Sequence, residues 1–170
     1  MRAHYLDPRN GNNFFDANAL DLTGGPEDAA VREILRLRDR GAFTLDMPHS
    51  VKSEIGHSHT PAAVKREAAH MIYTIPVPLT GPEQMTLDKV RAVIQGNARP
   101  GQHDNDARHV FESAKYGGRF FITNDARLLK KADEIWEILR PLRVVKPSEF
   151  LAAYSTHAEK RPLTAPSSRR

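Results

Sequence analysis

The chain has 170 residues, no cysteine and a formal net charge of +4 at pH 7. This length fits one domain with a single hydrophobic core, and the lack of cysteine excludes disulfides and thiolate metal sites. No apolar run approaches the roughly 20 residues that a membrane span requires, and the first residues lack the apolar core of a signal peptide. We therefore expect a cytoplasmic protein with no membrane partner, whose basic excess suits a polyanionic ligand as well as it suits solubility.

Strands and helices are predicted to alternate through the first half of the chain. Residues 24–28 place proline and acids where a helix begins, and Gly41 is positioned to end that helix. The predicted elements of this half are a strand at 12–15, a helix that runs to about 40, a strand at 42–47, a short helix from 48 that carries Glu54, and a helix from 60 to about 71.

The second half continues the alternation. Prolines restrict residues 74–79 to a short edge strand, because proline donates no backbone hydrogen bond. Thr80 and Glu83 have the spacing of a capping box. The remaining predicted elements are a helix to about 96, a loop at 97–102, a helix at 104–116, a strand at 119–123, a helix at 126–139, a strand at 143–145 and a short helix from 147. A single domain at 1–153 is thus followed by residues 154–170, which we expect to form a disordered basic tail.

This alternation predicts an α/β fold, a three-layer α/β/α sandwich around a central, mostly parallel sheet of about five strands. Ligands bind at the carboxyl ends of the strands in such sheets. Asp16 follows the first predicted strand and Asp125 follows the fourth, while Glu54 and Asp106 stand near the starts of helices. Carboxylates in a chain without cysteine favour hard divalent cations, so we expect these acids to form one metal site.

Several segments resemble a PIN domain. Residues 14–20, Phe-Phe-Asp-Ala-Asn-Ala-Leu, are similar to the family's opening strand, where the first metal-binding acid is followed two residues later by Asn, Ser or Thr. Asp106 resembles the family's third acid, and Thr123-Asn124-Asp125 resembles its Thr-x-Asp fourth acid. Residues 144–151 resemble its closing strand and helix, so the resemblance spans about residues 12–153.

Two features depart from the family pattern. Gly117-Gly118 adds one residue before the fourth predicted strand, at a turn where it should not displace the acid that follows. Glu54 matches the second acid by its place after the second strand, although the Gly-His-Ser-His that comes after it is unexpected. Glu67 is the alternative second acid.

The resemblance implies a PIN-like ribonuclease that depends on Mg²⁺ or Mn²⁺ and hydrolyses RNA phosphodiester bonds. Divalent ions lower the pKa of bound water and stabilise negative charge on the transferring phosphate, so the chemistry agrees with the acid set. Many relatives are VapC-like toxins of toxin–antitoxin pairs. RNA is therefore the expected substrate, an antitoxin protein a candidate partner, and a homodimer the expected assembly.

Roles follow from the same resemblance. Asp16, Asp106 and Asp125 are expected to bind metal directly, and Glu54 to bind a second ion or orient the attacking water. Residues expected to hold these ligands or contact the substrate are Asn18, Thr123, Asp104, Arg108 and Arg127. Asp104 is the weakest of these candidates. It lies two residues before Asp106 on the predicted helix, so its side chain should point to the opposite face.

Structural interpretations remain open for most of these residues. The alternatives are a helix-capping role for Asp106, an Asx turn for Asp16 and, for Glu54, a solvated helix acid paired with Lys52 or Lys65. The histidines 57, 59, 103 and 109 show no third ligand at a recognisable zinc spacing, so they are interpreted as surface residues, although His103 lies near enough to the acids to contact phosphate.

Two other functions remain as alternatives. A receiver-type phosphoacceptor domain also uses an acidic Mg²⁺ pocket and carries a Lys-Pro like residues 146–147. It requires two adjacent acids after its first strand and an aspartate at the end of its third, where this chain has a lone Asp16 and Pro76-Val77-Pro78. The other alternative is a PIN-like fold that binds RNA or protein without cleavage.

Overall fold

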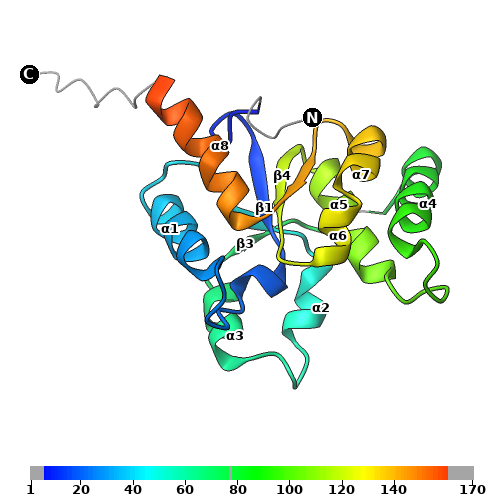
Figure 1. Ribbon diagram of the computed structural model, residues 1–170. Helices are drawn as coiled ribbons and strands as arrows, with labels where there is room; N and C mark the ends of the chain where they lie inside the picture. The colour runs from blue at the N-terminus through cyan, green and yellow to red at the C-terminus, as the bar shows by residue number, and fades with distance from the viewer. Residues whose placement is uncertain (1–5, 77, 161–170) are drawn as a thin grey trace, which may run out of the picture.

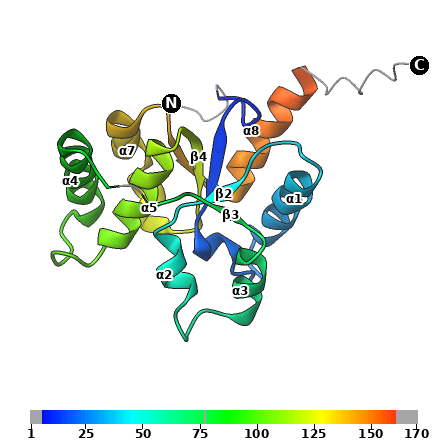
Figure 2. The ribbon, with the colours of Figure 1, turned by 180° about the vertical axis from the view of Figure 1, so that it is seen from behind.

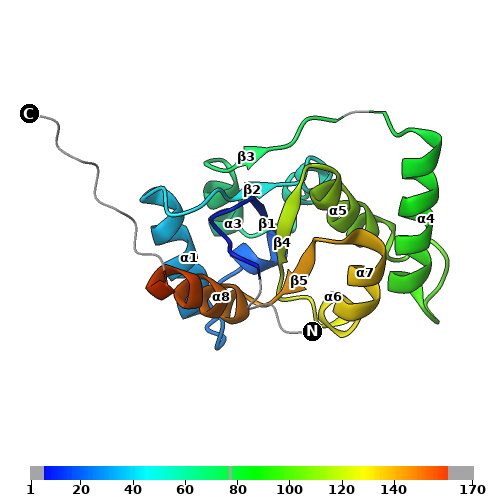
Figure 3. The ribbon, with the colours of Figure 1, turned by 90° about the horizontal axis from the view of Figure 1, so that it is seen from above.

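A five-stranded, entirely parallel sheet forms the centre of the protein, in the order β3-β2-β1-β4-β5. The structure is a computed structural model that describes residues 6–76 and 78–160. The strands are β1 (Asn12–Phe15), β2 (Asp46–Met47), β3 (Ile72–Tyr73), β4 (Gly118–Ile122) and β5 (Arg143–Val145). Figure 3 shows these strands in order from β3 at one edge to β5 at the other.

Helices cover both faces of this sheet, which confirms the predicted three-layer α/β/α sandwich (Figure 1). The helices are η2 (a 3₁₀ helix, Ala17–Leu20), α1 (Asp28–Asp39), α2 (Val51–Ile55), α3 (Ala62–Ala68), α4 (Gly81–Gln95), α5 (Asp104–Lys115), α6 (Ala126–Lys130), α7 (Ala132–Leu139) and α8 (Pro147–Lys160). In the part of the chain that the structure describes, none of them is both long and apolar enough to cross a membrane.

The core is divided by the sheet because successive strand residues point to opposite faces. Phe15, Phe120 and Ile122 pack with the side chains of α1, α3 and α8. Phe14 and Phe121 face the other way and pack with α4, α5, α6 and α7. Residues of the two central strands are therefore buried on both sides, as in other parallel sheets covered by helices.

The strands β2 and β3 differ in their bounds from the prediction. In β2 only Asp46–Met47 pair with neighbouring strands. The Thr44 carbonyl accepts a hydrogen bond from the Asn13 side-chain Nδ2 at 2.9 Å instead of from a strand backbone. β3 has the predicted edge position but lies at Ile72–Tyr73, before the prolines rather than among them. The ladder ends after the Thr74 N–H donates to the Met47 carbonyl, since the proline-rich residues that follow cannot continue it.

Two helical predictions are also corrected. The helix predicted at 126–139 is divided at Lys131, whose N–H bonds to the Arg127 and Leu128 carbonyls before α7 begins. The last helix is longer than expected, so residues 154–160 of the predicted disordered tail are helical. Tyr154 packs edge-on against Phe43 with ring centroids 5.4 Å apart, which gives the extended helix a contact with the core. Residues 161–170 of the predicted tail lie outside the described residues.

Candidate metal centre

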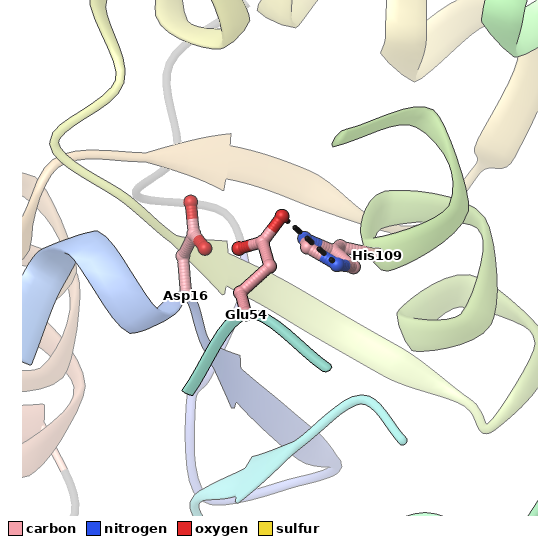
Figure 4. A group of neighbouring side chains, drawn as sticks. All are labelled: Asp16, Glu54 and His109. Atoms are coloured by element: carbon pink, nitrogen blue, oxygen red, sulfur yellow. Dashed lines mark ion pairs between the residues drawn. The ribbon is translucent and has the colours of Figure 1, made fainter. Parts of the chain in front are cut away.

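Three potential metal ligands meet at the carboxyl edge of the sheet. Asp16 follows β1, Glu54 lies on α2 and His109 lies on α5, and one donor atom from each falls within 4.8 Å of the others (Figure 4). Figure 2 shows α2 beyond the sheet, on the side where β1 leads into η2. Parallel strands and the helices that follow them therefore bring together residues that are far apart in sequence.

Asp16 is the most buried acid of the centre, with a relative exposure of 4%. Its N–H donates to the Ile122 carbonyl at 3.0 Å, which extends the pairing of β1 with β4 to the site. The pKa of Asp16 is raised to about 7, chiefly by burial, and a hydrogen bond donated by the Thr123 hydroxyl at 2.8 Å opposes this rise. Three nearby carboxylates also contribute to the raised pKa, those of Glu54, Asp106 and Asp125. Such repulsion is relieved when a cation binds between the carboxylates.

Glu54 occupies the position expected of the second acid. Its Oε1 lies 3.7 Å from the His109 Nε2, and its side chain is 34% exposed. Burial, followed by the negative charge of Asp106, raises the pKa of Glu54, while a hydrogen bond from Asn105 lowers it. The alternative acid Glu67 instead forms a salt bridge with Arg38 at 3.1 Å, so the geometry places Glu54, not Glu67, beside Asp16.

His109 was not expected in the centre. Its side chain is 1% exposed, so the interpretation of this histidine as a surface residue is wrong. Burial lowers the pKa of His109, and the charge of Asp106 opposes this shift. The available signal was the three-residue spacing from Asp106, which places both side chains on one face of a helix. The spacing alone does not show that this face of the helix lies beside Asp16 and Glu54, which only the folded structure shows.

Asp106 and Asp125 lie near the group of three but outside it. The Asp106 Oδ2 is 3.0 Å from the His103 Nδ1, so the nearest partner of this acid lies on its own helical turn. Asp125 caps α6, since its Oδ1 accepts the N–H groups of Arg127 at 2.6 Å and Leu128 at 3.0 Å. Capping was the alternative considered for Asp106, but it is Asp125 that caps a helix, and the charge of Asp125 nevertheless reaches Asp16.

Thr123 joins these acids through its hydroxyl group. The Thr123 Oγ1 donates to the Asp16 Oδ2, lies 3.1 Å from the Asn18 Oδ1, and accepts the Asp125 N–H at 3.0 Å. The Asn18 Oδ1 also accepts the Asn124 N–H at 3.1 Å. Thr123 and Asn18 therefore fix the spacing between the β1 and β4 ends of the centre.

The three remaining candidates contact other groups. Asp104 is exposed and lies 3.7 Å from the Arg91 Nε on α4, which agrees with a side chain directed away from the centre. Arg108 is also exposed and forms a salt bridge with Glu112 at 3.3 Å. Arg127 contributes its backbone N–H to the Asp125 cap, and its side chain is exposed.

A cavity of about 630 Å³ adjoins the centre. Ser50 and Asn105 connect the two, because both line the cavity and both interact with residues of the centre. Its basic residues are Lys52, Arg108 and Lys115, and its acidic residue is Glu112. The excess of cations gives this cavity a charge suited to an anionic ligand.

Comparison with models of protein families, with curated proteins and with solved structures finds no match to this chain.

Proposed function

We propose that this protein is a divalent-metal-dependent ribonuclease of the PIN-domain type, which hydrolyses RNA phosphodiester bonds. The observation that carries the proposal is the convergence of Asp16, Glu54 and His109 within 4.8 Å, with Asp106 and Asp125 near enough to raise the pKa of Asp16. Structural acids are more often separated or paired with cations. Acids gathered at the ligand-binding edge of a parallel sheet are instead typical of a metal centre.

The donor set fits a divalent cation on chemical grounds. Its carboxylate oxygens suit Mg²⁺ or Mn²⁺, and its buried histidine nitrogen has no hydrogen-bond partner among the described residues. When bound, such an ion lowers the pKa of water and stabilises charge on a phosphate. In this chain Asp16 and Glu54 would hold the ion, Thr123 would orient Asp16, and Asp106 and Asp125 would complete the negative charge around it.

The neighbouring cavity supports RNA as the substrate. Carboxylates alone would repel a phosphate backbone, so cations are needed beside them. Three cations line the cavity: Lys52, Arg108 and Lys115. Arg108 also forms a salt bridge with Glu112 at 3.3 Å, and Lys115 forms one with Glu83 at 3.0 Å. These exposed or partly exposed pairs cost little to exchange for phosphate contacts.

The receiver alternative fits the fold less well. Doubly wound sheets of the receiver type have the order 2-1-3-4-5, in which the third strand neighbours the first. Here the neighbours of β1 are β2 and β4, and β3 lies at the edge. No carboxylate ends β3, because Tyr73 is followed by Thr74.

The proposal extends to a toxin of a toxin–antitoxin pair, acting as a homodimer and blocked by an antitoxin protein. Expression of the chain in a bacterial host should then arrest growth, and co-expression of a genomic neighbour should restore it. Growth that is unaffected by an active enzyme would remove the toxin role without removing the ribonuclease.

Cleavage of RNA by the full chain tests the ribonuclease directly. Purified protein is incubated with single-stranded and structured RNA in Mg²⁺, in Mn²⁺ or in EDTA. We expect cleavage with metal only, and a loss of about 100-fold or more in Asp16→Asn and Asp125→Asn, since even residues that merely support metal ligands contribute 10- to 100-fold. Asp88→Asn is the matched control, because this exposed aspartate lies on α4 and contacts Arg91.

Three outcomes would contradict the proposal. Cleavage that survives in both Asp16→Asn and Asp125→Asn would remove the site. RNA binding without cleavage under every metal condition would favour the non-cleaving PIN-like alternative. Labelling of an aspartate by acetyl phosphate would favour the receiver.

A further inference from the structure

The His109 imidazole has a ring nitrogen that nothing in the described part of the chain satisfies. Its Nε2 is buried and has no hydrogen-bond partner. A buried polar atom left without a partner lowers the stability of the folded state, and an apolar side chain would fill the same space without that cost. His109 therefore requires an explanation other than packing.

The unpartnered nitrogen points into the acid cluster. Figure 4 shows the His109 ring directed at Glu54, whose Oε1 lies 3.7 Å from the Nε2. One oxygen of Asp16 completes a group whose donor atoms all lie within 4.8 Å of one another. Three donors bound about 2.1 Å from one ion are about 3–4 Å apart, so these atoms need to approach by about 1 Å or more to share an ion.

The Ser50 backbone also acts on the His109 ring. A hydrogen bond between the two raises the pKa of His109, against the larger effect of burial. Histidines that bind metals commonly donate one ring N–H to a backbone carbonyl or a carboxylate, which fixes the ring and leaves the second nitrogen for the ion. A backbone contact together with a buried Nε2 that has no hydrogen-bond partner agrees with this pattern.

His103, which precedes the first residue of the same helix, provides a useful contrast. Its Nε2 is also buried without a partner among the described residues, but its Nδ1 contacts Asp106 at 3.0 Å and it is not part of the group of three. His103 thus orients an acid, whereas His109 offers its nitrogen to the centre of the cluster.

We propose that the His109 Nε2 binds the metal ion directly, together with Asp16 and Glu54, and that this nitrogen makes the centre prefer a first-row transition ion over Mg²⁺. Mg²⁺ favours oxygen ligands, whereas imidazole suits transition ions, whose affinity for sites with nitrogen and oxygen ligands rises from Mn²⁺ to Cu²⁺ and falls again at Zn²⁺. The inference concerns the same centre as the proposed ribonuclease, but it rests on metal binding and requires no cleavage of RNA.

Mn²⁺ binding to the full chain tests this inference. Free Mn²⁺ is measured by electron paramagnetic resonance during titration, Mg²⁺ is added as a competitor, and the bound Mn²⁺ is examined for magnetic coupling to an imidazole ¹⁴N. We expect the wild-type protein to bind Mn²⁺ more tightly than Mg²⁺ and to show this coupling. His109→Gln should lose the coupling and bind Mn²⁺ about 10-fold or more weakly, while its Mg²⁺ affinity changes less.

His70→Gln is the matched control, because His70 is exposed at the end of α3 and should keep both the coupling and the affinity. Bound Mn²⁺ without ¹⁴N coupling in the wild-type protein would overturn the inference, and this result does not depend on the folding of any variant. Equal Mn²⁺ affinity in wild type and His109→Gln would also overturn it. If coupling is present but RNA is not cleaved, the metal ligand stands and the ribonuclease fails; if RNA is cleaved without coupling, the reverse holds.

Discussion

Asp16 bears the largest electrostatic cost of any residue in the metal centre. Its carboxyl is almost fully buried, accepts one hydrogen bond from Thr123 and faces further carboxylates. Burial and repulsion together raise its pKa to about 7, so without a cation the folded protein retains a proton on Asp16 that the unfolded chain releases near pH 4. The stability of the metal-free protein is therefore linked to pH through this side chain.

The sign of this linkage gives a prediction for Asp16→Asn. Between about pH 4 and pH 7 the folded state binds one proton more than the unfolded state, so rising pH lowers the free energy of unfolding. Above pH 7 both states have released the proton and the loss is complete. The variant lacks this contribution, so in EDTA its stability relative to wild type should increase by up to about 4 kcal/mol across this window and then level off. Urea unfolding from pH 5 to pH 8 should record about 3 kcal/mol of this increase, because each of the two pH units from 5 to 7 contributes about 1.4 kcal/mol.

The comparison between the two proteins isolates Asp16 from other titrating groups. Burial also raises the pKa of Glu54 and of Asp46, so these two groups likewise make the free energy of unfolding fall as pH rises. The lowered pKa of His109 has the opposite effect, because it makes the free energy of unfolding fall as pH decreases through about 6.5. Both proteins share these contributions. A stability difference that stays constant from pH 5 to pH 8 would show that Asp16 does not retain its proton.

The residues of the centre were predictable to different degrees. Asp16 could be placed from sequence because it directly follows an apolar strand, and strand ends converge at a known edge of the sheet. Glu54 could be placed by its order along the chain, with Glu67 as the alternative. His109 could not, because the helical spacing shows which residues share a face but not which partner that face meets.

At the scale of elements, the glycine pair before β4 sets the path of the chain into the sheet. Gly117 has a φ of +76°, which favours glycine in the turn after α5. Gly118 begins β4 in a confined space, where a Cβ atom would lie 2.5 Å from the Ser113 carbonyl oxygen and 2.7 Å from the Leu142 Cδ1. The additional glycine thus allows close packing of β4 against the end of α5.

Gly118→Ala should destabilise the protein because the obstructing Ser113 oxygen belongs to the backbone and cannot move independently. Overpacking of this kind costs about 1–3 kcal/mol. Gly81→Ala is the matched control: a Cβ there meets nothing within 4 Å, so the same substitution should stabilise α4 by about 0.4–1 kcal/mol through the unfolded state. Urea unfolding measures both, and equal effects at the two positions would contradict the role given to Gly118.

Elements with local signals were predicted well, and elements defined by distant contacts were not. The capping box of Thr80 and Glu83 is present as the spacing indicated. By contrast, β2 is short because the Asn13 side chain occupies the Thr44 carbonyl, and α8 is long because Tyr154 packs on Phe43. Both effects join residues far apart in sequence, so no pattern within either segment predicts them.

At the scale of the whole molecule, the metal centre joins parts of the fold that the hydrophobic core keeps separate. Asp16 extends from the central strand β1. His109 lies on α5, which packs on one face of the sheet through residues such as Val110, and α2 contributes Val51 to the cluster on the other face. Glu54 lies on that same α2. An ion bound by these three side chains would link both faces of the sheet at its carboxyl edge.

Removal of metal should therefore lower the stability of the entire domain and not only order at the site. An ion that binds the folded state alone stabilises it by about 2.7 kcal/mol at 100 times its dissociation constant, because the unfolded chain cannot bring these three residues together. We expect Mn²⁺ to raise the unfolding free energy of wild type and of Asp88→Asn by this amount, and EDTA to reverse the increase.

The Asp16→Asn variant should gain much less stability from Mn²⁺. It lacks a charged ligand for the ion, and it also lacks the carboxylate repulsion that the ion relieves in wild type. Thermal unfolding with and without Mn²⁺ measures the shifts, and an equal shift in Asp16→Asn would place the bound ion away from this centre.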